Sequence, residues 1–220
     1  MLPVIKVRRE DVLRREEIDL MLERAGEVYM GERLQCIIAL AWLFGKRIKE
    51  ILRIRREDVW TDDKYLYVRF LVEKKRSRGE FPISRFYTKK INLSNPYVPY
   101  VLNWINKVSS GYLFPGNTKP RILKVKAKYR DSTGRIVEKE YYYKLEGGHL
   151  SDARLRQLIK EINPKAYWHL FRESLATHMA EHGATEEELM HWFDWSDPRI
   201  AHEYIKRGTK LIEKWADRTW

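Results

Sequence analysis

Two histidines and a single cysteine are the residues of this chain that most readily suggest metal or thiol chemistry. His178 and His182 lie four positions apart in a predicted helix, a spacing that can place two ligands on zinc. Their segment reads H-M-A-E-H and no third ligand accompanies it, so we interpret them as a structural or surface pair. Cys36 lies in an apolar segment and is expected to be an unreactive core thiol. There is also no Gly-rich phosphate loop of the Walker type and no G-x-S-x-G motif, which excludes two common classes of catalytic site.

The remaining candidates form a dispersed set near the expected ends of helices. They combine permanent positive charge, an imidazole, and an indole nine residues before a phenol. These residues are Arg47, Glu50, His169, Arg172, Trp195 and Tyr204. A planar guanidinium can bind two oxygens of one phosphate, a phenol can act as a nucleophile, and an imidazole can accept or deliver a proton.

The order and spacing of these residues resembles the signature of the tyrosine recombinase, or phage integrase, family. That family carries an R-x-x-E block, a lysine on a β-hairpin, an H-x-x-R block, a His or Trp, and a tyrosine nine residues further on. Lys74 lies eight residues before Pro82 in a predicted hairpin, where the lysine of the family commonly falls. The resemblance covers about residues 10–208.

What the resemblance implies is site-specific DNA recombination through a covalent 3′-phosphotyrosine, without a metal or a nucleotide. Tyr204 would be the nucleophile, and Arg47 and Arg172 would stabilise the charge that develops on the phosphate. Lys74 would protonate the leaving 5′ oxygen, with Lys75 as its competitor. The nearest alternative activity is that of a type IB topoisomerase, and a non-catalytic DNA-binding module is the alternative outside the enzymes. An RNA-binding protein is less favoured, because no RNA-recognition motif occurs.

The two remaining members of the set have implied roles as well. His169 would contact the phosphate or take the proton of the nucleophile, and Trp195 would pack against the phosphate. Each residue of the set also has a structural alternative. Arg47 could serve only as an ion-pair partner of Glu50, His169 could be a core histidine beside its neighbouring tryptophan, and Trp195 and Tyr204 could be ordinary packing residues.

The chain departs from the family pattern in its site residues and in its expected domain organisation, and one of the departures is Trp195, which stands where a histidine is commoner. Glu173 stands where relatives often have a second histidine. Residues 116–147 form a basic hairpin longer than that of many relatives, either an extra DNA clamp or a thermostabilising insertion. We expect residues 1–220 to be a single catalytic domain without the N-terminal core-binding domain of the family. The helical tail, residues 209–220, would dock either on a neighbouring protomer or on its own domain.

The elements that must position these residues follow from hydrophobic periodicity and turn signals. A capping box is expected from Thr185 and Glu188, and Gly183 suits the C′ position of the preceding helix. Helices are predicted at about 10–29, 32–44, 46–54, 97–109, 152–162, 169–182, 186–193, 198–206 and 210–218. Strands are predicted at 65–72 and 81–93, with a second hairpin at 121–130 and 136–145. The expected fold class is α+β, mainly α, with a small antiparallel sheet and the extra basic hairpin.

The charge distribution favours double-stranded DNA as the partner. The chain of 220 residues has a formal net charge of +12, and residues 61–150 hold 19 basic and 8 acidic side chains. The candidates for phosphate contacts are Lys75, Arg76, Arg78, Lys124, Lys126 and Lys128. We further expect a homotetramer on paired DNA sites, a monomer or weak oligomer without DNA, a cytoplasmic, nucleoid-associated location, and no membrane association. The low glutamine and cysteine content and abundant Lys, Arg and Glu suggest a thermophilic source.

Overall fold

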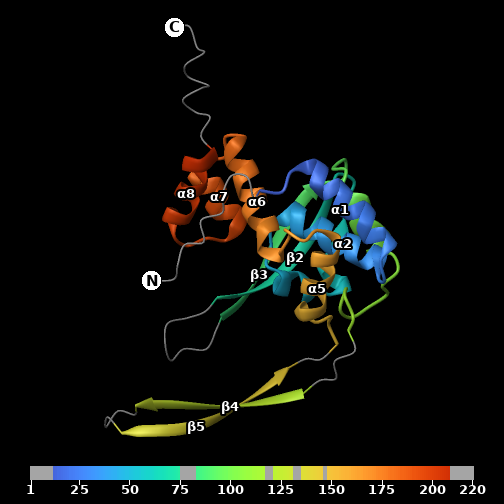
Figure 1. Cartoon of the computed structure of the whole chain (residues 1–220). Helices are drawn as coiled ribbons and strands as arrows, with labels where there is room; N and C mark the ends of the chain where they lie inside the picture. Colours follow the sequence, from blue (N-terminus) through green and yellow to red (C-terminus); the bar gives the residue numbers. More distant parts are fainter. Residues whose placement is uncertain (1–11, 75–82, 117–120, 131–134, 146–147, 209–220) are drawn as a thin grey trace, which may run out of the picture.

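The fold is seen in a computed structural model that describes residues 12–74, 83–116, 121–130, 135–145 and 148–208 (Figure 1). Its helices are α1 (Arg15–Glu27), α2 (Gly31–Phe44), α3 (Ile48–Leu52), the 3₁₀ helix η2 (Arg56–Asp58), α4 (Val98–Ile105), α5 (Asp152–Ile162), α6 (Trp168–Glu181), α7 (Glu186–Phe193) and α8 (Pro198–Gly208). Its strands are β1 (Val59–Thr61), β2 (Tyr65–Lys74), β3 (Ile83–Asn92), β4 (Arg121–Arg130) and β5 (Ile136–Leu145). The predicted α+β, mainly α, fold class is confirmed.

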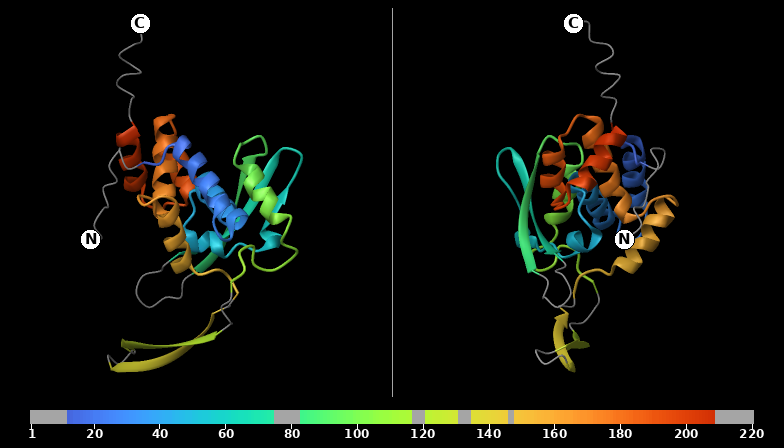
Figure 2. Two further views of the ribbon diagram at one scale, coloured as in Figure 1. Left: turned by 45° about the vertical axis from the view of Figure 1, so that its right-hand side comes forward. Right: turned by 90° about the vertical axis from the view of Figure 1, so that its left-hand side faces the viewer.

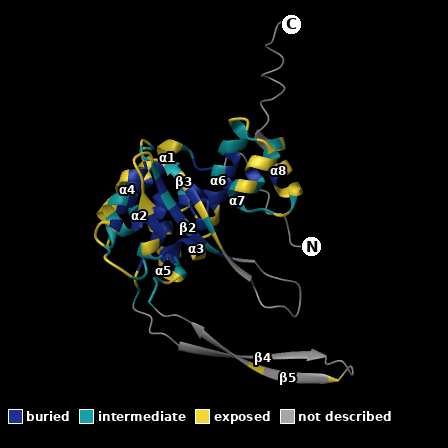
Figure 3. Ribbon diagram, turned by 180° about the vertical axis from the view of Figure 1, so that it is seen from behind, coloured by how far each residue is buried: buried dark blue, intermediate teal, exposed yellow. Residues whose placement is uncertain are grey.

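A three-stranded antiparallel sheet lies against the helices, with β2 between β1 and β3. Alternate residues of β2, Leu66, Val68 and Phe70, are completely buried, as the period of two in a half-buried strand requires. Phe70 meets Phe44 at the end of α2 with ring centroids 5.3 Å apart. Figure 3 shows the buried residues gathered where α2 and the sheet face each other.

The apolar core is divided into two clusters. The larger one joins α1 to α5, the three-stranded sheet and the first turn of α6. The smaller one is built on the second half of α6 with α7 and α8, and its buried members are Ala176, Leu189, Phe193 and Ala201. Figure 1 shows α6, α7 and α8 together at one end of the molecule, beside α1 and α2. The sequence motifs are therefore distributed over two packing units that meet along α6.

The second hairpin, β4–β5, extends away from both clusters in each view (Figures 1 and 2). Its base is tied to the larger cluster by hydrogen bonds from Gly116 N to Gly148 O at 2.7 Å and from Leu150 N to Phe114 O at 2.8 Å. Phe114 is fully buried. The hairpin is thus a projection with a fixed base.

Most predicted elements agree with the structure to within a few residues. The capping box of α7 is present, because Glu188 N donates to Thr185 Oγ1 and Thr185 N donates to Glu188 Oε2. Gly183 follows α6 with a φ of +88°. Strand β1 was not predicted, and the predicted helix at 210–218 lies outside the described residues. Within the part of the chain that the structure describes, no helix is long and apolar enough to cross a membrane.

Candidate active site

Arg47 lies at the start of α3, directly after a tight turn at the end of α2. Gly45 makes that turn with a φ of +57°, a left-handed conformation that favours glycine. The Glu50 carboxylate accepts hydrogen bonds from the backbone N–H and from Nη1 of Arg47, both at 3.0 Å. The Arg47 side chain nevertheless keeps 56% of its surface exposed. The ion pair that was the structural alternative therefore exists, and it holds an exposed guanidinium in place rather than burying it.

Arg172 has the opposite environment, since only 3% of the residue is exposed. Its Nη1 donates to Gly45 O at 2.8 Å and its Nη2 donates to Phe193 O at 2.5 Å. The guanidinium also lies over the rings of Phe193, at 4.9 Å, and Trp195, at 5.4 Å. Arg172 thus bridges the turn that precedes Arg47 and the end of α7.

Trp195 and Tyr204 form an aromatic stack in the smaller cluster. Their ring centroids are 5.2 Å apart at an interplanar angle of 10°. Trp195 also stacks on Phe193 at 4.7 Å, and its backbone N–H donates to Met190 O. The nine-residue spacing is explained by this stack, because it spans the turn after α7 and the first two turns of α8. Both residues do pack as their structural alternative supposed, and the Trp195 ring also contacts the Arg172 guanidinium.

His169 lies one helical turn before Arg172 at the start of α6. Its side chain is 52% exposed, so the alternative of a core histidine is wrong. Its Nε2 lies 3.7 Å from the buried carboxylate of Glu173, which also accepts a hydrogen bond from Tyr167 Oη at 2.8 Å. Glu173, the departure from the family pattern, therefore sits beside the histidine and faces away from water.

The electrostatic effects show that these groups act on one another. Loss of hydration, followed by the charges of Arg172 and Arg47, lowers the pKa of His169. Burial, followed by the charge of Arg47, lowers the pKa of Arg172 to about 10, which still leaves it charged at neutral pH. Tyr204 contributes in the opposite direction to the pKa of Arg172. The structure thus brings Arg47, His169, Arg172, Trp195 and Tyr204 into one site.

The predicted hairpin lysine is only partly placed. Lys74 is the last residue of β2 and pairs in register with Ile83, but its side chain is outside the described part of the structure. The phosphate contacts predicted for Lys75, Arg76 and Arg78 also lie outside the described residues.

The remaining DNA-binding candidates lie on β4, whose backbone alone is described. They are Lys124, Lys126 and Lys128. In the register of the hairpin, Lys126 is opposite Glu140 and Lys128 is opposite Glu138. Their contact with DNA stays a prediction.

Three buried charged residues next to the site were not predicted from the sequence, namely Lys46, Lys89 and Asp194. The burial of Lys89 could have been expected, because Lys89 falls between Tyr87 and Ile91 on the same, inward face of β3. The burial of Lys46 had no signal in the sequence, because the segment K-R-I-K-E looks like the solvated start of a helix.

The histidine pair has the structural role that the sequence suggested. His178 Nε2 lies 2.8 Å from Leu13 O, and its ring meets the edge of Trp42 at 5.4 Å. Among the described residues, no group of three or more His, Cys, Asp or Glu side chains could hold a metal ion. Cys36 is fully buried, and burial raises the pKa of its thiol well above the usual value.

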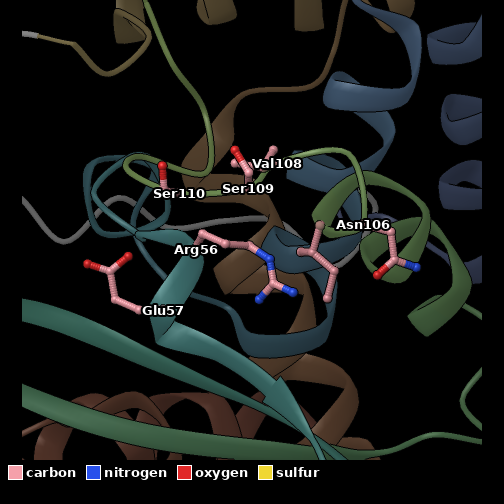
Figure 4. Close-up of a pocket in the computed structure, with 7 residues that line it drawn as sticks. Arg56, Glu57, Asn106, Val108, Ser109 and Ser110 are labelled. Atoms are coloured by element: carbon pink, nitrogen blue, oxygen red, sulfur yellow. The ribbon is translucent and has the colours of Figure 1, made fainter.

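A cavity of about 450 Å³ lies apart from this set of residues, at the junction of η2 and the end of α4 (Figure 4). It is lined by Arg56, Glu57, Ile105, Asn106, Val108, Ser109 and Ser110. None of the predicted catalytic residues lines it, so we do not connect it with the chemistry.

Comparison with known proteins agrees with this geometry. The model of the phage integrase family matches residues 11–210. The tyrosine recombinase XerD of Caulobacter vibrioides is 28% identical over 176 residues, which are 79% of this chain and 50% of that protein. The XerH site-specific recombinase, in a post-cleavage complex with palindromic difH substrate, matches with a TM-score of 0.62 at 14% identity, covering 93% of this chain and 52% of that one. The Tn1549 transposon integrase, in complex with circular intermediate DNA, matches with a TM-score of 0.61 at 12% identity, covering 97% and 66%.

The two structural matches show a shared fold, and the chain spans about half the length of XerD and XerH. The family model extends over nearly the whole chain and over every residue of the site described above. The chain therefore belongs to the phage integrase family.

Proposed function

We propose that this chain catalyses site-specific DNA recombination by cleaving and rejoining strands through a covalent 3′-phosphotyrosine at Tyr204. The observation that carries the proposal is the buried guanidinium of Arg172 over the Trp195 ring, at 5.4 Å, with Trp195 stacked on Tyr204. Family membership over residues 11–210 supports the same activity. We infer that no metal and no nucleotide is required.

The chemistry follows from the charges. Attack of the Tyr204 oxygen on phosphorus forms a P–O bond, breaks the bond to the 5′ oxygen and increases the negative charge on the non-bridging oxygens. Arg47 and Arg172 would stabilise that charge, and a preorganised cation in a water-poor site does so far better than one in bulk water. Rejoining is the reverse attack, by a 5′ hydroxyl of the partner strand. Because the phosphotyrosine retains the energy of the phosphodiester, no nucleotide hydrolysis is needed.

Two proton transfers accompany each step. The phenol of Tyr204 must lose a proton, and we assign His169 as its acceptor, because burial and the charges of Arg172 and Arg47 lower the pKa of this imidazole and so favour its neutral form. The leaving 5′ oxygen must gain a proton, which we assign to Lys74, with Lys75 as the alternative donor. Glu50 would hold Arg47 through the 3.0 Å ion pair.

The proposed partner is double-stranded DNA. XerH and the Tn1549 integrase, whose fold this chain shares, are both described in complexes with DNA. Recombination pairs two DNA sites, so we expect a homotetramer on DNA and a monomer or weak oligomer without it. A Tn1549 relative supports an origin in a mobile element. We expect the protein to act in the cytoplasm, at the nucleoid.

The test is the capture of the covalent intermediate. A library of nicked duplexes with randomised arms is incubated with the protein, and adducts are resolved on a denaturing gel. The nick releases a short product after cleavage, so rejoining is blocked and the adduct accumulates. We expect an adduct with the native chain and none with Tyr204→Phe.

Tyr29→Phe is the matched control, because Tyr29 is 80% exposed in the turn between α1 and α2. It should form the adduct at the native rate. Persistence of the adduct in Tyr204→Phe would overturn the assignment of the nucleophile. DNA binding without any adduct would favour a non-catalytic module. Relaxation of supercoiled plasmid without strand exchange would indicate a topoisomerase.

A further inference from the structure

The C-terminal end of α7 is held by cationic side chains from three other parts of the chain. Arg172, on α6, donates to Phe193 O at 2.5 Å, and Lys89, on β3, donates through Nζ to His191 O at 2.6 Å. The third cation is Lys46, in the turn between α2 and α3. The last carbonyl groups of a helix lack partners within the helix and carry partial negative charge, so cations are favourable there.

Asp194 directly follows α7 as its C-cap residue, and its carboxylate contacts two of these cations. Its Oδ2 is ion-paired with Lys46 Nζ, and its Oδ1 lies 3.5 Å from Lys89 Nζ. Lys46 is 1% exposed, and the side chains of Lys89 and Asp194 are each 8% exposed. A buried charge is tolerated only when it is paired, so loss of the Asp194 charge would leave two buried lysines with no carboxylate at this point.

This ion-pair group stands where the two core clusters meet. Lys46 directly precedes Arg47, and Asp194 directly precedes Trp195, which stacks on Tyr204. The backbone of Gly45 also lies close to the ring of Phe193 here, since a Cβ on Gly45 would come within 2.5 Å of Phe193 Cε1. The Asp194 ion pairs therefore join the chain segments on the two sides of the site.

We propose that Lys46, Asp194 and Lys89 form a buried ionic latch that positions α7 and α8, the second of which carries Tyr204, against the larger cluster, next to which Arg47 lies. The proposal rests on the proposed function. The three are positioning residues, because their charged groups are ion-paired with one another. A displacement of about 1 Å between reacting groups can slow a reaction about 100-fold, so a latch at this place controls the rate of cleavage.

The test replaces the shared carboxylate by its neutral isostere. Asp194 has a φ of +54°, which asparagine tolerates, so Asp194→Asn removes the charge with little change of shape. We expect the single-turnover cleavage rate at saturating nicked DNA to fall at least tenfold, while the Kd for DNA stays within twofold. Amide hydrogen exchange without DNA should become faster within residues 186–208 and not within α2. Lys46→Met, which removes the main partner of the carboxylate, should reproduce this pattern.

Asp58→Asn is the matched control. Asp58 is 5% exposed in the main body, where its carboxylate accepts from Arg69 Nε at 2.7 Å and from Arg55 N at 3.0 Å. Loss of the Asp58 charge should lower Tm, as should loss of the Asp194 charge. It should leave the cleavage rate and the amide exchange of α7 and α8 unchanged well below Tm.

Two results would overturn the latch, namely native exchange in residues 186–208 of Asp194→Asn, or a native cleavage rate in that variant. A slow rate in Asp58→Asn as well would show that general destabilisation is the cause. Failure of the native chain to form any adduct would overturn the proposed function instead, and the exchange measurement would still decide whether the latch holds the helices.

Discussion

The two arginines of the site are held by different means, and this difference defines their roles. Arg172 is buried and fixed by the carbonyl groups of Gly45 and Phe193. Arg47 is exposed and fixed by one buried carboxylate, that of Glu50. An arginine that joins two backbone segments contributes to folding as well as to charge, whereas an arginine held at the surface contributes mainly charge. The consequences of replacing them should therefore separate.

Lysine substitutions test this separation. Arg47→Lys should slow cleavage about 100-fold, because an ammonium cannot present two parallel N–H groups to the phosphate, and should change stability by less than about 1 kcal/mol. Arg172→Lys should slow cleavage as strongly and also lower Tm, because one ammonium cannot reproduce both hydrogen bonds to the carbonyl groups. Single-turnover cleavage and thermal unfolding measure the two effects. Equal changes in Tm would contradict the assigned difference.

At the scale of the element, the turn between α2 and α3 is a tight junction between the two clusters. Gly45 ends α2, its carbonyl accepts from Arg172, and its α-carbon faces the ring of Phe193. Both its backbone conformation and the available space exclude a side chain. The active site depends on this glycine because Gly45, at the end of α2 in the larger cluster, approaches Phe193 of the smaller cluster directly.

Gly45→Ala should destabilise the protein by roughly 3 kcal/mol. About 1–2 kcal/mol is the cost of an alanine in the left-handed region, and the rest is the contact with Phe193 Cε1. Gly183→Ala is the control, because Gly183 also has a positive φ, +88°, but a Cβ there would meet nothing within 4 Å. Gly183→Ala should lower the free energy of unfolding only by the cost of an alanine in the left-handed region. Urea unfolding of both variants measures the difference, and equal losses would show that the contact with Phe193 is absorbed elsewhere.

The elements themselves were largely predictable, because each carries a local signal. Thr185 and Glu188 indicate the start of α7, and alternation in residues 65–72 indicates a half-buried strand. Strand β1 could not be predicted, since three residues show no period and Val59 is placed by its pairing with Val68. The candidate site residues were proposed from a resemblance to the family pattern, which their order and spacing match. The ion pair between Lys46 and Asp194 could not be predicted, because it joins positions 148 residues apart and depends on tertiary packing.

For the molecule as a whole, the charge and the core are distributed differently. The described core residues come from all along the chain, from Val12 to Ala201, whereas most of the net positive charge lies in residues 61–150. Much of that charge is carried by the β4–β5 hairpin, for residues 117–147 hold nine basic and four acidic side chains. The register places glutamates opposite Lys126 and Lys128, which reduces the local excess. The hairpin is therefore either a DNA clamp or a stabilising insertion, and a deletion separates the two.

Replacing residues 117–147 by a short turn should leave the fold intact, because Gly116 N and Gly148 O are already joined at 2.7 Å. As a DNA clamp, which we expect, the hairpin should be needed for affinity: the Kd should rise and its salt dependence should become less steep, by about 0.9 in slope for each phosphate that the hairpin no longer neutralises. Fluorescence anisotropy between about 50 and 200 mM salt measures this slope.

The triple replacement of Lys124, Lys126 and Lys128 by glutamine should reproduce part of the change, by roughly 1 to 3 in slope, without altering Tm. A fall in Tm with an unchanged slope would instead identify a stabilising insertion.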